Sequence, residues 1–146
     1  MSGGRYFLDT NIFVYSLDRQ NPSKAKIALS VIETHTFNRT GVVSFQVVQE
    51  FFNVALRKFK LPFDARQCEL FLDGVCVPLL GVHSSVQLFE RGLELMPKLR
   101  ISWYDSLIVA AAAEAGCSVL YSEDLENGRR IGGLEIRNPF ELKSSP

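Results

Sequence analysis

Four acidic side chains occur where a protein rarely keeps an acid without a use. Asp9 and Asp124 each follow a short apolar stretch that is typical of a β-strand. Asp105 and Glu50 fall on the apolar faces of two predicted helices, at spacings of three and four from hydrophobic residues. Carboxylates that converge raise one another's pKa unless a cation lies among them. Oxygen-only ligands select hard cations, so the four acids together predict a site for Mg²⁺ or Mn²⁺.

Each acid also has an ordinary structural explanation when it is taken alone. Asp9 fits the N-cap of the helix that follows it, and Asp105 fits a capping box with Ser102. Asp124 fits a turn after a strand, and Glu50 fits a partner for a basic side chain. These alternatives stay open for each residue, but four acids gathered at one sheet edge favour the cation site.

Histidine and cysteine do not offer a rival site. His35 and His83 lie in segments predicted to be exposed and match no ligand spacing, so we expect neither a Ser-His-Asp triad nor a His-rich zinc site. The cysteines, Cys68, Cys76 and Cys117, are odd in number and lack a C-x-x-C spacing, which predicts buried free thiols. This cysteine usage favours a cytoplasmic location.

Strands and helices alternate along the chain. The pattern predicts strands over residues 5–8, 41–44, 75–80, 119–121 and 134–136. It predicts helices over 10–17, 44–58, 64–72, 84–95 and 103–115, with a further helix beginning at Pro22. The expected fold class is α/β, one domain over residues 1–146 with loose ends at 1–4 and 143–146. A mainly parallel central sheet of about five strands is flanked by helices on both faces.

The central strands of such a sheet position the acids. Active sites in open parallel sheets lie outside the carboxyl ends of the strands, where Asp9 and Asp124 fall. The 146 residues are 47% hydrophobic, enough for a real core. Sixteen basic residues balance sixteen acidic ones, which argues against a strongly basic nucleic-acid coat protein. No apolar run is long enough for a membrane span, and no secretory leader is predicted.

Several motifs in order resemble the PIN-domain ribonucleases, and more narrowly the VapC toxins of prokaryotic toxin–antitoxin pairs. They are FLDTN at residues 7–11, QE at 49–50, YDSLIVA at 104–110 and SEDL at 122–125. The resemblance covers nearly the whole chain, and the first and third motifs are fairly specific together. It implies an endoribonuclease that depends on Mg²⁺ or Mn²⁺ and leaves 5′-phosphate and 3′-hydroxyl ends.

The resemblance also implies a role for each matching residue. Asp9, Glu50, Asp105 and Asp124 fall on the acidic quartet of the family, as metal ligands or as the group that orients the attacking water. Asn11 and Ser122 fall on polar positions that orient these carboxylates. Glu123 is a departure, because it offers a second carboxylate beside Asp124; the spacing of the family favours Asp124.

Basic residues near the acids are candidates for holding RNA phosphates. Arg57 and Lys60 follow Glu50, and Arg129 and Arg130 follow Asp124. The alternative is that they are solvated cations at element ends. Trp103 and Tyr104 could stack on bases, but an aromatic residue at a helix start is more often core.

The resemblance implies partners as well as a substrate. These are RNA, a cognate antitoxin and a second copy of the chain in a homodimer, with no membrane. Apolar side chains on two predicted helices would serve either protein contact, unless they are core: Phe13, Val14, Phe51 and Phe52. The alternative function is a PIN-fold module that binds RNA or protein without cutting it.

Overall fold

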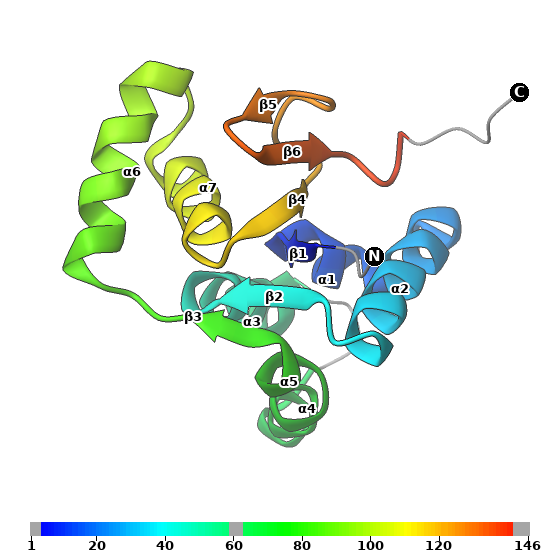
Figure 1. Cartoon of the computed structure of the whole chain (residues 1–146). Coiled ribbons are helices and arrows are strands. Elements are labelled where there is room, and N and C mark those ends of the chain that lie inside the picture. The colour runs from blue at the N-terminus through cyan, green and yellow to red at the C-terminus, as the bar shows by residue number, and fades with distance from the viewer. Residues whose placement is uncertain (1–3, 59–62, 142–146) are drawn as a thin grey trace, which may run out of the picture.

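The chain forms a six-stranded sheet in a computed structural model that describes residues 4–58 and 63–141. The strands are β1 (Arg5–Leu8), β2 (Gly41–Ser44), β3 (Leu80–Val82), β4 (Cys117–Tyr121), β5 (Arg130–Ile131) and β6 (Leu134–Arg137). Their order is β3-β2-β1-β4-β6-β5, and every pairing is parallel except the antiparallel β5–β6 pair (Figure 1). The predicted α/β class with a mainly parallel sheet is confirmed.

Helices flank this sheet. They are α1 (Thr10–Ser16), α2 (Pro22–Phe37), α3 (Phe45–Lys58), α4 (Ala65–Phe71), α5 (Val77–Leu79), α6 (Val86–Leu99) and α7 (Trp103–Glu114), with a π-helical turn η1 (Leu72–Cys76). In Figure 1, α1 and α3 lie behind β1 and β2, while α7 lies against β4 and α6 packs outside α7. The connections between strands therefore carry the helices that cover the sheet.

Local sequence explains where these helices begin. Asp64 and Gln67 form a reciprocal capping box at the start of α4, which lies within the helix predicted over residues 64–72. Ser102 accepts a hydrogen bond from the backbone N–H of Asp105 at the start of α7. Residues 106–112 of α7 are all buried, which explains why this helix is apolar on every side rather than amphipathic.

The two central strands fix the register of the site. Leu8 of β1 pairs with Tyr121 of β4, and the N–H of Asp9 donates to the carbonyl of Tyr121. The first residues after both strands therefore lie side by side at the carboxyl edge. Both strands are anchored in the core by buried side chains such as Phe7 and Leu120. Asp9 and the residues that follow β4 thus share one edge of the sheet.

The predicted strand over residues 75–80 is wrong. Residues up to Leu79 are helical, in η1 and α5, and β3 starts at Leu80. Pro78 lacks a backbone N–H, which a helix tolerates in its first turn and a sheet ladder does not. A short apolar run has no periodicity that separates a buried strand from a buried helix.

Two smaller boundaries also differ from the prediction. The helix predicted over residues 84–95 is α6, which has Ser85 as its cap and continues to Leu99 with Pro97 in its last turn. Strand β5 has only two residues and was not predicted. It pairs with β6 across a turn that contains Gly132 and Gly133, so it adds a sixth strand to the expected five.

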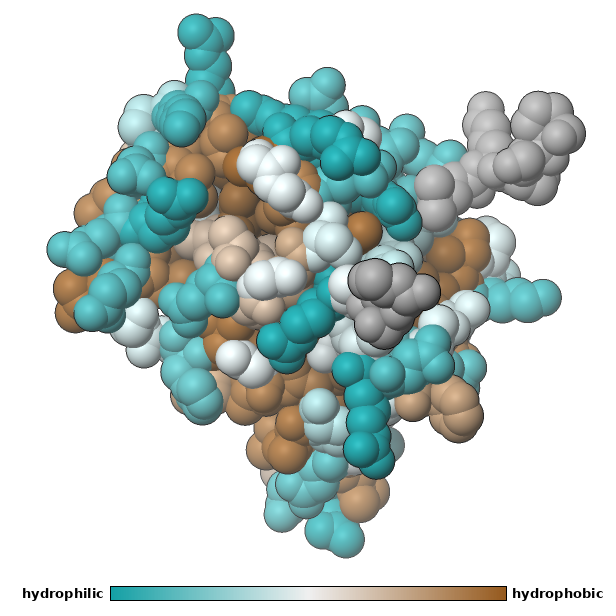
Figure 2. Space-filling model, in the orientation of Figure 1, coloured by the Kyte–Doolittle hydropathy of each residue, from teal (hydrophilic) through white to brown (hydrophobic). Residues whose placement is uncertain are grey.

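The surface combines charged residues with two exposed apolar areas. Figure 2 shows hydrophobic side chains over α6 and over the α4–α5 region, between hydrophilic ones. The exposed members include Val86 and Leu93 on α6, and Leu70 and Val77 on α4 and α5. Within the described residues, no helix has the length and apolar character to cross a membrane.

Candidate active site

The centre of the site is the pair formed by Asp9 and Ser122 at the ends of β1 and β4. Asp9 is 3% exposed and Ser122 is fully buried. The Ser122 hydroxyl donates to Asp9 Oδ2 at 2.7 Å, and the N–H of Thr10 donates to Asp9 Oδ1 at the same distance. The sequence-based alternative for Asp9 is therefore also correct, because this residue is the N-cap of α1.

Burial dominates the electrostatics of Asp9. It raises the pKa of this carboxyl from 3.8 to about 7, against the hydrogen bonds from Ser122 and Thr10. The negative charges of Asp124 and Glu50 raise this pKa further, so both acids lie within electrostatic range. A buried carboxylate with two acidic neighbours is stabilised when it binds a proton or a metal cation.

Asp124 lies in the loop after β4 and turns toward Asn11 of α1. Asn11 Nδ2 donates to Asp124 Oδ2 at 3.2 Å, and the Asp124 N–H donates to the Ser122 hydroxyl at 3.1 Å. Asn11 therefore contacts one acid of the group, Asp124, and Ser122 contacts both Asp9 and Asp124. Both residues hold carboxylates by hydrogen bonds that orient them.

Glu123 points to a different set of partners from its neighbour Asp124. Lys24 of α2 forms an ion pair with Glu123 at 2.5 Å, and Tyr15 of α1 donates a hydrogen bond at 2.8 Å. The Lys24 ammonium also lies 4.4 Å from the centre of the Tyr15 ring. The charge of the Glu123 carboxylate is thus balanced by Lys24, in contacts separate from those of Asp124.

Glu50 of α3 is held by two residues that the sequence analysis did not single out. Thr10 donates from its hydroxyl to Glu50 Oε1 at 2.7 Å, and Gln46 donates from Nε2 to Glu50 Oε2 at 3.2 Å. The i, i+4 spacing of Gln46 and Glu50 on one helix was the available signal for the second contact. Thr10 belongs to the FLDTN motif, but its partner lies 40 residues away.

Asp105 lies in the first turn of α7. Partial burial raises the pKa of its carboxyl, the Ser102 hydroxyl lowers it, and the charges of Asp124 and Glu50 raise it. Of the predicted capping box, the bond from the Asp105 N–H to the Ser102 hydroxyl is present. Because Asp9 and Asp105 each sense Asp124 and Glu50, the fold brings all four predicted acids into one electrostatic group.

The donor chemistry of this group fits a divalent cation. In the described part of the chain, no cluster of three or more His, Cys, Asp or Glu side chains is already arranged to hold an ion. Mg²⁺ usually keeps several waters and takes few carboxylates directly, so a loosely spaced set of acids suits it. Asn11 Oδ1 is buried without a hydrogen-bond partner beside Asp124, which leaves one further oxygen donor.

The predicted RNA-binding cations lie in three different settings. Arg57 is exposed near the end of α3, two turns after Glu50. Arg130 pairs with Glu135 across the β5–β6 hairpin at 3.3 Å, whereas Arg129 is half-buried at its start. Lys60 lies outside the described residues. Their contact with RNA stays a prediction.

Several residues that the sequence placed on the surface or in the core lie elsewhere. His35 is 7% exposed, bonds through Nδ1 to the Thr40 hydroxyl and lies against Tyr6. The prediction that it is solvent exposed is wrong, since its helix packs that face on the sheet. Tyr104 is 63% exposed, so the preference for a core role is wrong for this residue.

The other predictions about buried side chains are mostly confirmed. Cys76 and Cys117 are buried and Cys68 is half-buried, all as free thiols. Phe13 and Phe51 belong to the core, which removes them from the candidates for a protein contact. Val14 and Phe52 are partly buried against the same core.

The fold and the site together define a small α/β protein whose acids gather at the carboxyl ends of its central strands. A sequence model of the PIN domain matches residues 6–132, and the chain belongs to this family. The resemblance seen in the motifs is therefore confirmed at the level of the family. No curated protein matches the chain significantly.

Solved structures share the fold over most of the chain. A toxin–antitoxin complex from Klebsiella pneumoniae aligns with a TM-score of 0.64 at 18% identity, over 94% of this chain and 99% of that one. VapBC2 from Rickettsia felis, bound to a DNA fragment from its promoter, aligns with a TM-score of 0.60 at 26% identity, over 91% and 97%. VapC20 from Mycobacterium tuberculosis, a toxin that cleaves the sarcin–ricin loop, aligns with a TM-score of 0.56 at 16% identity, over 80% and 88%.

Proposed function

We propose that this protein is a Mg²⁺- or Mn²⁺-dependent endoribonuclease and the toxin of a toxin–antitoxin pair. The observation that carries the proposal is the gathering of Asp9, Glu50, Asp105 and Asp124 into one electrostatic group at the carboxyl edge of the sheet. Similarity to VapBC2 and VapC20, in a chain that belongs to the PIN family, supports both the nuclease and the toxin role.

The residues divide the work of hydrolysis among them. Asp9, Asp105 and Asp124 would hold the ion, with Ser122 and Asn11 fixing the orientation of two of these carboxylates. When bound, the ion supplies Lewis-acid polarisation of the phosphodiester and lowers the pKa of a water. Glu50, fixed by Thr10, is the acceptor for the proton of the attacking water.

A cleavage assay with a matched pair of variants tests the nuclease. The purified protein is incubated with total RNA and Mg²⁺ or Mn²⁺, beside Asp105→Asn and Asp73→Asn. Asp105→Asn keeps the cap of α7, because Ser102 bonds to the backbone of residue 105. Asp73 is an exposed acid on η1, outside the acidic group, and serves as the control.

We expect discrete metal-dependent cuts with wild type and Asp73→Asn. Asp105→Asn should lower the cleavage rate at least about 100-fold. Mutation of a residue that only orients a metal ligand usually costs tenfold to 100-fold, and the loss of a ligand should cost more. Cuts that persist in Asp105→Asn would contradict the role of this residue. A folded wild type that cuts no RNA with either ion would favour the alternative of a non-catalytic RNA- or protein-binding module.

The toxin role has its own test and its own surface. Expression in a bacterial host should stop growth, whereas expression of Asp105→Asn should not. An antitoxin would have apolar side chains to cover on α3, α4 and α5, namely Leu56, Leu70 and Val77, which are 53–59% exposed. Equal growth with both forms would remove the toxin role while leaving the nuclease intact.

The homodimer stays a prediction, which sedimentation of the purified chain checks.

A further inference from the structure

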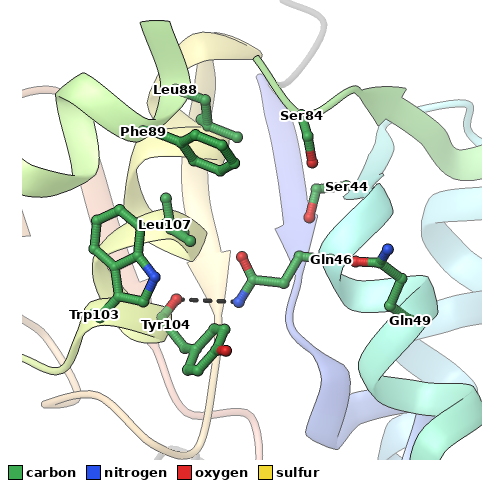
Figure 3. A pocket seen from close by; sticks show the side chains of 9 residues that line it. All are labelled: Ser44, Gln46, Gln49, Ser84, Leu88, Phe89, Trp103, Tyr104 and Leu107. Atoms are coloured by element: carbon green, nitrogen blue, oxygen red, sulfur yellow. Dashed lines mark hydrogen bonds between the residues drawn. The ribbon is translucent and has the colours of Figure 1, made fainter. Parts of the chain in front are cut away.

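A groove of about 370 Å³ lies beside the acidic group and is not part of it. It is enclosed by the end of β2, the start of α3, the loop before α6, α6 itself and the start of α7 (Figure 3). This volume is near the lower end of the range for small-molecule sites, so it suits one planar group rather than a large ligand.

The two walls of the groove have different chemistry. One wall is apolar and largely aromatic, formed by Leu88, Phe89, Trp103, Tyr104 and Leu107. The facing wall carries only hydroxyl and amide groups, from Ser44, Ser84, Gln46 and Gln49. None of the lining residues is charged, so the groove offers little to a phosphate.

Several hydrogen-bonding groups in this groove have no partner among the residues that the structure describes. Gln46 uses its Nε2 on Glu50 and on the carbonyl of Tyr104, at 3.2 and 3.1 Å, which leaves its Oε1 free. The side chains of Gln49, Ser84 and Trp103 form no hydrogen bond within the described residues. Donors and acceptors therefore face an aromatic wall across a narrow space.

The groove is joined directly to the acids. Gln46 Nε2 donates both to Glu50 and to the carbonyl of Tyr104, which is the neighbour of Asp105. An occupant of the groove therefore lies next to the residue that contacts Glu50.

We propose that this groove binds one unpaired nucleobase of the RNA strand that is cut at the acids. The proposal rests on the proposed nuclease function and adds a specificity site to it. A base stacks on aromatic side chains and presents donors and acceptors at its edge, which matches the two walls. The free Oε1 of Gln46 is an acceptor for an exocyclic amino group.

A protein side chain is the competing occupant, because Phe89 is 44% exposed at the groove. An apolar side chain would bury the free amide and hydroxyl groups without partners, which is costly. A base satisfies them, and the uncharged lining favours it over the ribose-phosphate backbone. The structure thus favours the base.

The single tryptophan of the chain provides the measurement, since Trp103 lines the groove. The full-length protein, without metal, is titrated with adenosine, guanosine, cytidine and uridine, and with ribose as the matched probe that lacks a base. Nucleosides carry no phosphate, so repulsion by the acids does not mask binding. Tryptophanamide with the same nucleosides corrects for absorption.

We expect saturable quenching of Trp103 by at least one nucleoside and none by ribose. Gln49→Ala and Phe89→Ala should each weaken the response, the aromatic change by roughly 5- to 100-fold. Phe37→Ala is the control, because Phe37 is 88% exposed at the far end of α2 and should bind like wild type. Melting curves verify that each variant is folded.

Two results would overturn the proposal. One is quenching by no nucleoside beyond that by ribose, and the other is a response that Gln49→Ala and Phe89→Ala leave unchanged. If, with no nucleoside response, Phe89→Ala turns a dimer into a monomer, the groove is an interface between copies. This assay needs neither metal nor cleavage, so its failure is separate from failure of the nuclease assay.

Discussion

The hydroxyl of Ser122 donates a 2.7 Å hydrogen bond to the buried carboxylate of Asp9, across the ends of two neighbouring parallel strands. This contact joins residues 113 positions apart in the chain. Both the hydrogen-bond donor and the acceptor are buried, so water does not compete with either. The acidity of Asp9 is therefore set by the fold, and it can be measured.

Stability should fall as the pH rises from about 4 to about 7. The folded state raises the pKa of Asp9 from 3.8 to about 7, so in this window the folded chain holds a proton that the unfolded chain has released. The loss is on the order of 4 kcal/mol at most, at about 1.4 kcal/mol per pKa unit.

Asp9→Asn should remove most of this pH dependence of stability. At pH 8 the variant should melt at a higher temperature than wild type, because the amide carries no buried charge and asparagine still caps α1. Denaturant unfolding of both proteins at a series of pH values measures it. Mn²⁺ should also stabilise wild type more at pH 8 than at pH 5. Parallel pH profiles for the two proteins would show that Asp9 ionises normally.

Thr10→Val should impair catalysis more than folding. The change removes the donor that holds Glu50 Oε1 and keeps the shape of the side chain, so we expect a tenfold to 100-fold lower cleavage rate, by the usual effect of such orienting partners. Thr36→Val is the matched control, since the buried Thr36 hydroxyl has no hydrogen-bond partner. The control should cleave normally and unfold no more easily than wild type.

Glu123→Gln should leave metal binding within about twofold of wild type, because Lys24 and Tyr15 already occupy this side chain. Its melting temperature should fall by a few degrees at most, as expected for a partly exposed ion pair worth about 1 kcal/mol or less. Asp124→Asn should weaken Mn²⁺ binding at least about tenfold, measured by calorimetry. The reverse ranking of the two variants would assign the ligand to Glu123.

Phe51→Ala should destabilise the chain by about 3–5 kcal/mol. Phe51 is 1% exposed and stacks on Phe71 with ring centres 4.5 Å apart, and Phe13 meets it edge to face. Phe52→Ala, at the partly buried neighbour, should cost less. Urea unfolding of both variants compares them, and equal losses would mean that the cluster around Phe51 is not the packing centre.

The four acids could be singled out from the sequence because each rests on a local pattern. Asp9 and Asp124 follow recognisable strands, and Asp105 and Glu50 interrupt helical apolar faces, so their positions follow from period and strand order. Thr10 and Gln46 escaped prediction because their shared partner is chosen by packing between α1 and α3. A hydrogen bond between side chains of two different helices depends on tertiary packing, which local sequence does not reveal.

The errors in the fold have the same origin. Residues 75–79, just before β3, are apolar, so periodicity does not separate a strand from the helical turn that residues 77–79 form, and Pro78 was the available signal for the turn. His35 looked exposed because its helix is weakly amphipathic, yet it packs on Tyr6 and Tyr121. Neither aromatic contact leaves a trace in spacing along the chain.

Both edge strands of the sheet are short, which disfavours the addition of a further strand. The edge strands β3 and β5 have only three and two residues, too short to template a long run of main-chain hydrogen bonds. Short edge strands also protect a sheet against edge-to-edge aggregation. We therefore expect a protein partner to bind this chain mainly through side chains rather than by β-strand addition. Partner choice can then change through surface substitutions that leave the sheet and its acids untouched.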